Sequence, residues 1–545
     1  MAENINILSA AAMGAPTPRP YIASMTTRST ALIVGAGFGG LAIAIELRRR
    51  GIDDFVILEK ADDLGGVWRE NTYPGAGCDV PSPLYSFSFA HTPRWPRRYA
   101  LQPDIQAYLQ RVARDFDILR HIRFGREVTE AEFDETTARW RVSTAGTGAG
   151  EPELFEASAF IPAVGQLSRP AMPDIPGIDE FTGTAFHSAE WNHDCDLEGK
   201  RVAVIGTGAS AIQFVPEIQP KVAHLSVFQR SAQHILPRRD HAYDRWYHAP
   251  LRAVPALQKL DRFGFWLYTE FAQSCMSRWT ALTPVFRLQT ARHLRTQVAD
   301  PALRTALTPD YTLGCKRVLF SNDYLPAITQ SNVDLVTDDI TEITPGGVRT
   351  ADGTEHEVDV IVYGTGFAAL ELLAPMTIRG LRGRELTEAW SEGARAHLGI
   401  TVPGFPNMFL MYGPNTNLGG GSIVYMLESQ ARYVRAAVQR LAARPGRFLD
   451  VRPEAERAWD AMVQSRLARS VWTRCHSWYR NAHGRVVSNW PGRTREYRLR
   501  TRTLDPADFR IGVVSRGDTT GAGSSRDDTT GIAAATPGTS EEVTA

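Results

Sequence analysis

The strongest constraint on the fold is a strand–glycine–helix pattern that occurs twice in this chain of 545 residues. The first copy begins with an apolar run at residues 31–34 and continues with Gly35, Gly37 and Gly40 in the spacing GxGxxG. The first glycine of this spacing allows a tight turn, the second lets the backbone approach a pyrophosphate, and the third lets helix and strand pack closely. The free N–H groups at the helix start can then face the phosphates. The sequence therefore predicts a dinucleotide site of the Rossmann type.

An acid completes the first site. A run of strand-forming residues at 55–58 ends in Glu59, which lies 19 residues after Gly40. A carboxylate in this place accepts hydrogen bonds from the 2′-hydroxyl of a ribose. The first site is thus predicted to prefer a nucleotide without a 2′-phosphate, such as FAD.

The second copy has the opposite charge at the matching place. Its strand at residues 201–205 leads into Gly206, Gly208 and Ala211, and Arg230 lies 19 residues after Ala211. A carboxylate there would repel a 2′-phosphate, whereas a guanidinium can bind it with two hydrogen bonds. Ser231 adds a hydroxyl donor. The second site is predicted to bind NADPH, so that electrons pass from NADPH to a flavin.

Composition excludes several other classes of protein. Lys+Arg and Asp+Glu are both 60, so a zero net charge gives no reason to expect nucleic acid or an anionic membrane as partner. The five cysteines form no CxxC pair, which argues against a zinc ribbon or a dithiol redox site, and their scarcity fits a reducing cytoplasm without a disulfide framework. No secretory signal or membrane span is recognised, since the apolar stretch at residues 31–45 is short and contains four glycines.

These patterns predict an α/β fold with two Rossmann-like domains and a helical insertion in the second. The expected ranges are a disordered tail at 1–28, an FAD-binding part at 29–165, an NADPH-binding domain at 166–335 with its insert at about 240–310, a second FAD-binding part at 336–509, and a disordered tail at 510–545. Met25 could be the natural start. The aromatic segment at 263–271 of the insert is interpreted as a helix core in preference to a substrate-pocket wall.

A third motif lies between the two copies. Phe181, Gly183, His187 and Trp191 follow the spacing FxGxxxHxxxW. This resembles the fingerprint of type I Baeyer–Villiger monooxygenases, although Asn192 stands where that family commonly has Pro or Asp. The related flavin-containing monooxygenases, which oxygenate nitrogen or sulfur, usually carry Tyr or a similar residue in place of the Trp.

Three further stretches extend the resemblance from about residue 31 to about residue 500. Gly65-Gly66-Val67-Trp68 with Asp79 is similar to a flavin-facing signature of the family, and Gly314-Cys315-Lys316-Arg317 resembles the pair that carries its catalytic arginine. Gly364-Thr365-Gly366-Phe367 resembles the point where the chain returns to the FAD-binding domain.

The resemblance implies roles residue by residue. Arg317 is expected beside the flavin C4a position, with Asp79 as its partner, and both are the predicted catalytic residues. His187 is expected to couple the domains from the linker, not to act as a base. The FAD site would comprise Gly35, Gly37, Phe38, Gly40, Glu59, Trp68, Asp79, Tyr85 and Val128. The NADPH site would comprise Gly206, Thr207, Gly208, Ala209, Ser210, Arg230, Ser231 and Lys316, and no metal is expected.

The implied reaction inserts one oxygen atom beside a ketone carbonyl. NADPH reduces FAD, O2 adds to give a C4a-peroxyflavin, and the fixed positive charge of Arg317 stabilises it as an anion. The alternatives are a nitrogen- or sulfur-oxygenating flavin monooxygenase, a reductase that serves a protein partner, and a non-catalytic nucleotide-binding module. Glycines at 413–421 are expected close to the flavin ring, and Trp490 is interpreted either as a lid or as part of a surface loop. The ketone is not identifiable, and a cytoplasmic monomer without integral membrane association is the default.

Overall fold

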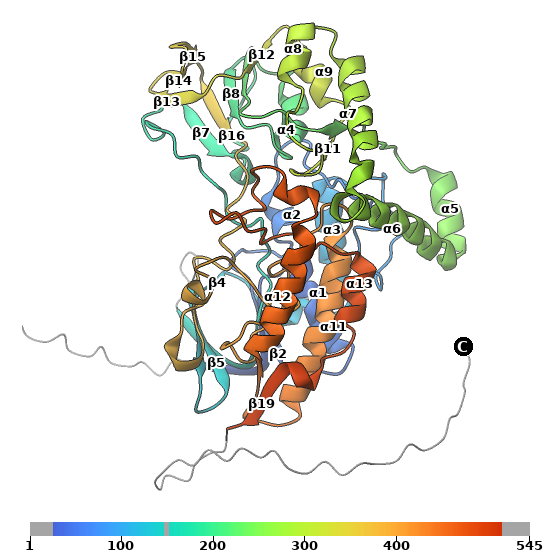
Figure 1. Ribbon diagram of the computed structural model, residues 1–545, viewed down its shortest axis with the longest axis vertical. Coiled ribbons are helices and arrows are strands. Elements are labelled where there is room, and N and C mark those ends of the chain that lie inside the picture. Colours follow the sequence, from blue (N-terminus) through green and yellow to red (C-terminus); the bar gives the residue numbers. More distant parts are fainter. Residues whose placement is uncertain (1–25, 147–151, 515–545) are drawn as a thin grey trace, which may run out of the picture. The chain divides into compact units, whose positions relative to one another are not determined.

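Two sheets form the framework of the computed structural model, which describes residues 26–146 and 152–514 (Figure 1). The first sheet has seven strands in the order β17-β4-β5-β6-β1-β2-β3, and the second has five in the order β12-β9-β8-β16-β7. The strands of the first sheet are β1 (Thr27–Val34), β2 (Phe55–Leu58), β3 (Ile122–Arg123), β4 (Arg126–Asp134), β5 (Arg139–Gly146), β6 (Glu153–Pro162) and β17 (Thr377–Arg379). Those of the second are β7 (Thr184–His187), β8 (Arg201–Ile205), β9 (His224–Phe228), β12 (Val333–Val336) and β16 (Val360–Tyr363). The predicted α/β fold with two Rossmann-like units is confirmed.

The central strands are parallel, and their sequences explain why. Every residue of β2 and of β16 is buried, as expected for apolar runs that are covered on both faces of a sheet. β1 pairs in parallel with β2, and β8 pairs in parallel with β9. Parallel pairing brings the carboxyl ends of neighbouring strands to one edge, where the two glycine-rich loops begin.

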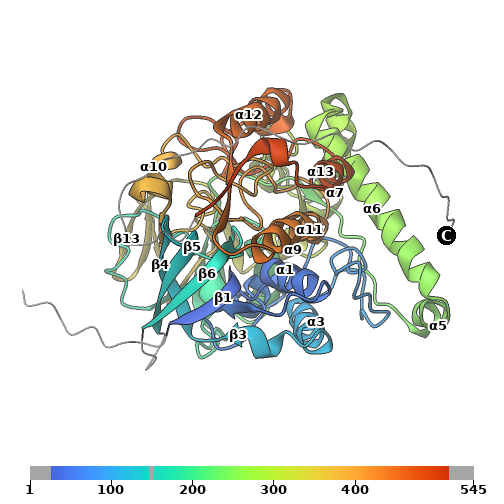
Figure 2. The same ribbon diagram turned by 90° about the horizontal axis from the view of Figure 1, so that it is seen from below.

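The helices cover these sheets and extend beyond them. Figure 2 shows α1, α3 and α11 on the same side of the first sheet, and α1 packs against α11 although they are far apart in the sequence. The helices are α1 (Phe38–Arg48), α2 (Val67–Glu70), α3 (Gln102–Asp115), α4 (Ala211–Ile218), α5 (Arg245–Ala253), α6 (Pro255–Ser277), α7 (Thr283–Gln297), α8 (Pro301–Ala306), α9 (Tyr324–Ile328), α10 (Leu386–Ala389), α11 (Ile423–Ala442), α12 (Pro453–Leu467) and α13 (Thr494–Arg500). No helix in the described ranges is long and apolar enough to cross a membrane.

The aromatic segment of α6 differs from the prediction. Phe263, Tyr268 and Phe271 are exposed, so the interpretation of this segment as a helix core is wrong for these three side chains. The buried face of α6 is instead largely polar and includes Thr269, Glu270 and Gln273. A count of aromatic residues could not show which face of the helix turns inward.

Smaller strand pairs complete the fold. They are β10 (Ile235–Leu236) with β11 (Leu319–Phe320), β13 (Ile340–Thr344) with β14 (Gly347–Thr350) and β15 (Glu355–Glu357), and β18 (Arg447–Val451) with β19 (Phe509–Val513). β1 and β19 include residues 27–28 and 510–513, which the sequence assigned to disordered tails. The remainder of both predicted tails, with Met25, lies outside the described residues. The other domain boundaries stay predictions.

Candidate active site

A cavity of about 1840 Å³ runs past both glycine-rich loops. Ligand pockets usually measure about 300–1,000 Å³, so this cavity has room for more than one ligand. Its wall contains all of the predicted site residues except Gly40: Gly35, Gly37, Phe38, Glu59, Trp68, Asp79, Tyr85, Val128, Gly206, Thr207, Gly208, Ala209, Ser210, Arg230, Ser231, Lys316 and Arg317. Residues from both halves of the chain therefore meet in one hollow.

The first glycine-rich loop has the geometry of a phosphate cradle. A Cβ atom added to Gly40 would lie 1.9 Å from the carbonyl oxygen of Gly35, so only glycine fits where α1 packs on its loop. α1 begins at Phe38 without a side-chain cap and without an acid in its first turn. Its backbone N–H groups are thus available to an anion. α4 in the second unit likewise starts without a side-chain cap or a nearby acid.

Glu59 is held at the end of β2 by backbone donors. Its buried carboxylate accepts hydrogen bonds from the Ala36 amide at 2.8 Å and the Ala61 amide at 3.0 Å. These bonds fix the carboxylate beside the first loop, and its remaining lone pairs can accept a ribose hydroxyl. The fixed acid supports the predicted preference of this site for a nucleotide without a 2′-phosphate.

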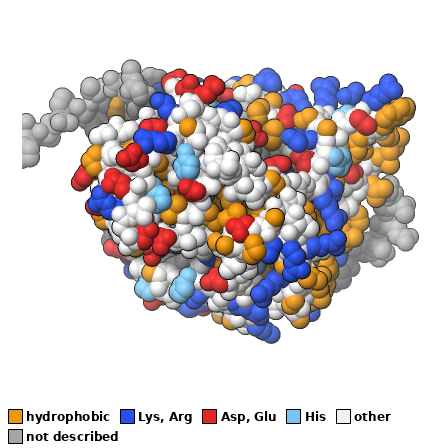
Figure 3. All heavy atoms as spheres, turned by 90° about the horizontal axis from the view of Figure 1, so that it is seen from above, with side chains coloured by type: hydrophobic (Ala, Val, Ile, Leu, Met, Phe, Trp, Pro, Cys, Tyr) orange, Lys and Arg blue, Asp and Glu red, His pale blue; other side chains and the backbone are white. Residues whose placement is uncertain are grey.

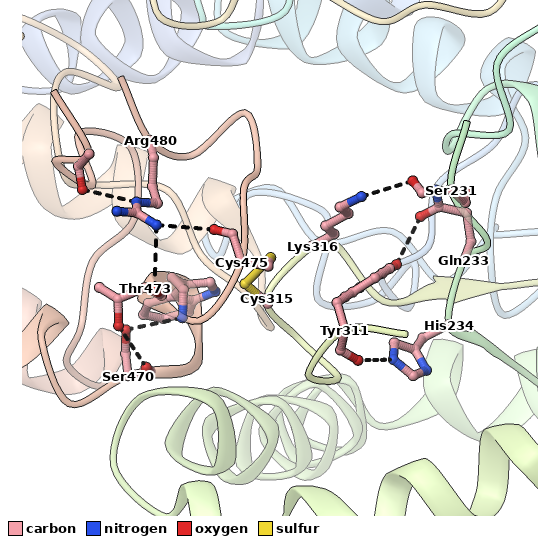
Figure 4. The surroundings of a disulfide bond; sticks show 12 residues. Ser231, Gln233, His234, Tyr311, Cys315, Lys316, Ser470, Thr473, Cys475 and Arg480 are labelled. Carbon is pink, nitrogen blue, oxygen red and sulfur yellow. Dashed lines mark hydrogen bonds between the residues drawn. A yellow bond between two sulfur atoms is a disulfide. The ribbon is translucent and has the colours of Figure 1, made fainter. Parts of the chain in front are cut away.

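A positively charged group lies beside the second loop. The ammonium of Lys316 donates a hydrogen bond to the Ser231 hydroxyl at 2.8 Å, and Figure 4 shows these two side chains facing each other. Burial, and then the positive charge of Arg230, lower the pKa of Lys316. An anion placed between these two positive charges would stabilise both of them. Arg230, Ser231 and Lys316 are therefore a candidate anion site.

Arg317 and Asp79 form an ion pair in the cavity wall. Arg317 Nε donates to Asp79 Oδ2 at 3.0 Å, and one terminal nitrogen donates to Oδ1 at 2.7 Å. The pair joins positions 238 residues apart, and 38% of the Arg317 side chain remains accessible. The negative charge of Asp79 raises the pKa of Arg317, so the guanidinium stays charged at any working pH. Two parallel bonds also fix the plane of the guanidinium.

Gln213 couples this region to the second glycine-rich unit. Gln213 lies on α4. Its side-chain oxygen accepts hydrogen bonds from the Tyr73 hydroxyl at 3.0 Å and the Gly77 amide at 3.2 Å, and its side-chain nitrogen donates to the Gly77 carbonyl at 3.0 Å. Gly77 lies two residues before Asp79. No motif marked Gln213, because its role depends on a contact between distant segments.

Two tyrosines near Arg317, Tyr412 and Tyr479, were not predicted from the sequence. Tyr412 lines the cavity and donates from its hydroxyl to Asn417 Oδ1 at 2.8 Å. Burial raises the pKa of Tyr479 to about 12, so its hydroxyl stays protonated. Tyr412 precedes the glycine-rich stretch at 413–421, which was the only sequence signal in its neighbourhood.

Gln273 joins α6 to that stretch. Its side-chain oxygen accepts from the amides of Gly419 and Gly420 at 3.1 and 3.0 Å, and its nitrogen donates to the Trp490 carbonyl at 2.8 Å. The Trp490 ring is fully buried and stacks on Trp459 with the ring centres 5.4 Å apart. Both interpretations of Trp490, as a lid and as part of a surface loop, are wrong, because its ring belongs to the core.

A disulfide connects the loop of Arg317 to the C-terminal part of the chain. Cys315 and Cys475 are bonded, and Figure 4 shows this bond beside Lys316. The prediction of no disulfide is wrong for this pair, because the fold brings together cysteines 160 positions apart. The bond fixes the segment that continues to Trp478, another residue of the cavity wall.

His187 lies outside this wall. It ends β7, its Nδ1 accepts from the Ala189 amide at 3.1 Å, and its ring forms a T-shaped contact with that of Phe367. Burial lowers the pKa of His187, which favours the neutral ring. The geometry suits a linker residue better than a base. Within residues 26–146 and 152–514, no cluster of three or more His, Cys, Asp or Glu could hold a metal ion.

Comparisons with known proteins identify relatives of this chain in sequence and in structure. Residues 28–371 match the model of the flavin-binding monooxygenase-like family. A Baeyer–Villiger monooxygenase of Streptomyces coelicolor is 45% identical over 483 residues, which cover 88% of this chain and 92% of the relative. A solved structure of an oxidized steroid monooxygenase bound to NADP has a TM-score of 0.77 at 33% identity, covering 88% of this chain and 97% of the other. The structure of OTEMO in complex with FAD and NADP has a TM-score of 0.78 at 28% identity, with coverage of 88% and 97%.

Proposed function

This chain belongs to the flavin-binding monooxygenase-like family, among its Baeyer–Villiger monooxygenases, and from that premise we propose how its residues oxidise a ketone with NADPH and O2. The product is an ester or lactone that carries one additional oxygen atom. The observation that carries the proposal is the Arg317–Asp79 ion pair, which lies in the wall of one cavity shared by both glycine-rich loops.

The residues present fit both cofactors. FAD would lie along the first loop, with its phosphates at the start of α1, a ribose at Glu59, and the remainder near Trp68 and Tyr85. NADPH would lie along the second loop, with its 2′-phosphate between Arg230 and Lys316. When bound, FAD would carry electrons from NADPH to O2, which is the source of the inserted oxygen atom.

Arg317 supplies the electrostatic part of the reaction. Attack on a carbonyl carbon places negative charge on oxygen, and a fixed cation in a partly dry site stabilises that charge. Arginine is suited to this role because it cannot lose its proton in the working pH range. Asp79 holds the guanidinium in one orientation through two parallel hydrogen bonds. Asp79 is therefore a positioning residue for Arg317.

The same ion pair separates this reaction from the oxygenation of amines or sulfides. Nitrogen and sulfur are themselves nucleophiles and require an electrophilic, protonated oxygen, which a permanent cation does not favour. A ketone requires the opposite polarity. The Arg317–Asp79 pair thus favours ketones as substrates over amines and thioethers.

The protein also needs to keep water away from the reacting atoms. Gln213 joins the second unit to the loop that leads to Asp79, and Gln273 joins α6 to the glycines at 419–420. These bridges connect the walls of the cavity across distant segments, which suits a site that excludes solvent during turnover. We also propose a cytoplasmic location, because a reaction that consumes NADPH depends on a supply of that cofactor, and we keep a monomer as the default state.

The proposal is tested by purifying the protein and screening a panel of ketones. We expect flavin absorbance, NADPH consumption that depends on the ketone, and products heavier than the substrates by one oxygen atom. A protein that converts only thioethers or amines, with no ketone turned over, would contradict the proposed reaction.

A further inference from the structure

The helices α5 to α7 carry an unusual concentration of exposed apolar side chains. Of the 17 large hydrophobic side chains exposed in the described residues, 11 lie between positions 246 and 288. Single exposed apolar residues are normal on a protein surface, but a contiguous group marks an interaction site. We propose that the exposed side chains of residues 245–297, here called the insert patch, dock on an anionic lipid bilayer.

The apolar part of the insert patch forms a stripe along α6. Leu260, Phe263, Leu267 and Phe271 recur at intervals of three or four residues and are 63%, 54%, 56% and 45% exposed. This is the spacing of one face of a helix. The ring of Phe271 meets that of Trp279 with the centres 6.0 Å apart, which continues the stripe toward α7. An amphipathic helix of this kind can lie in the plane of a membrane surface without crossing it.

The charges of the insert patch have a single sign. Residues 245–297 contain eight Lys or Arg and two Asp or Glu, a net charge of +6 in a chain whose total is zero. Seven of the eight cations are exposed, whereas Arg262 is buried and donates to backbone carbonyls at 2.7–3.2 Å. Figure 1 draws α5 and α6 at the right-hand edge of the molecule. At the right-hand edge of Figure 3, Lys and Arg side chains (blue) lie beside hydrophobic ones (orange).

Both acids of this segment are occupied by internal contacts. Asp261 accepts a hydrogen bond from the Tyr247 hydroxyl at 2.7 Å, and buried Glu270 accepts from the Thr494 amide at 2.8 Å. Neither carboxylate therefore offsets the exposed cations. Cations around an apolar stripe complement an anionic lipid surface. A second copy of this chain fits less well, because a symmetric contact would bring the cations of both copies together.

The insert patch also borders the cavity. Tyr268 is 56% exposed and lines the cavity, and Ala272 and Met276 on the inner side of α6 line it as well. The docking surface and the cavity wall thus share residues of one helix, so that an apolar ketone leaving the lipid phase would have a short path to the site. The entry of a ketone by this route rests on the proposed function, whereas docking itself requires no catalysis.

Docking is measured by flotation of the FAD-loaded, full-length protein with lipid vesicles. We expect the protein to bind vesicles that contain both phosphatidylglycerol and phosphatidylcholine. Its binding to vesicles of phosphatidylcholine alone should be at least tenfold weaker. The double variant Arg287→Glu/Arg292→Glu should lose at least tenfold in binding, because each cation near an anionic surface contributes roughly fivefold. Phe263→Glu/Leu267→Glu should lose binding to a similar extent.

Matched controls carry the same changes elsewhere on the surface. Leu119→Glu and Arg384→Glu replace an exposed apolar side chain and an exposed cation outside the insert patch, and both should bind vesicles like the wild type. Flavin absorbance reports whether each variant is folded. Absence of vesicle binding by the wild type, or equal binding by the patch variants, would overturn the proposal. So would a dimer in analytical ultracentrifugation that Leu267→Glu dissociates, since the patch would then be a contact between copies.

Discussion

The charge at position 230 should decide which nicotinamide cofactor the enzyme uses. Arg230→Ala removes one of the two cations placed to bind a 2′-phosphate and leaves Lys316 with its hydrogen bond to Ser231. A hydrogen bond to a charged group contributes about 1.5–3 kcal/mol. Because Arg230 is exposed, the lower end of this range applies. A loss of about 1.4 kcal/mol weakens the binding of NADPH about tenfold.

The assay compares steady-state kinetics with NADPH and with NADH. We expect KM for NADPH to rise about tenfold in Arg230→Ala, with kcat nearly unchanged, because the lost contact is made equally before and during the reaction. KM for NADH should change little, since NADH has no 2′-phosphate. Arg239→Ala removes an exposed arginine outside the cavity wall and serves as the control. An unchanged ratio of the two KM values in Arg230→Ala would refute the assignment of this site.

Three further predictions concern the loops of the site. Gly40→Ala should release FAD during gel filtration, because its methyl group would lie 1.9 Å from the Gly35 carbonyl, whereas Gly264→Ala, which meets open space, should retain it. A reductant should lower the melting temperature of the wild type but not of Cys475→Ser, since loop closure over 160 residues is worth about 5 kcal/mol. The pKa of Lys316 is lowered, so this side chain should lose its proton, and its attraction for the 2′-phosphate, at a pH below the ordinary lysine value of 10.5. KM for NADPH should therefore increase as the pH is raised toward 10.5, and Lys316→Arg should abolish that increase.

The sequence predicted the parts of the site that local motifs encode. The spacing of glycines identified both loops, and the residue at the end of the next strand separated an acidic from a basic site, at Glu59 and Arg230. These features are local because a turn, a helix start and a strand end lie within about 25 residues. The pairing of Arg317 with Asp79 was known only through the family resemblance.

Contacts between distant segments were not predictable in the same way. Gln213 and Gln273 have no motif, because each acts by bridging backbone groups that only the folded chain brings close. The Cys315–Cys475 bond is hidden for the same reason. The exposed aromatics of α6 were misjudged because aromatic residues are usually buried, and the zero net charge of the chain concealed the cationic insert.

The central claim is that a fixed cation at position 317 is what makes oxygen insertion possible. The most direct test measures Arg317→Ala for bound flavin, for NADPH oxidation and for product formed from a ketone that the wild type accepts. We predict that flavin stays bound and NADPH is still oxidised, while product formation falls by at least about 100-fold and H2O2 is released instead. Ketone turnover at the wild-type rate in Arg317→Ala would contradict the account.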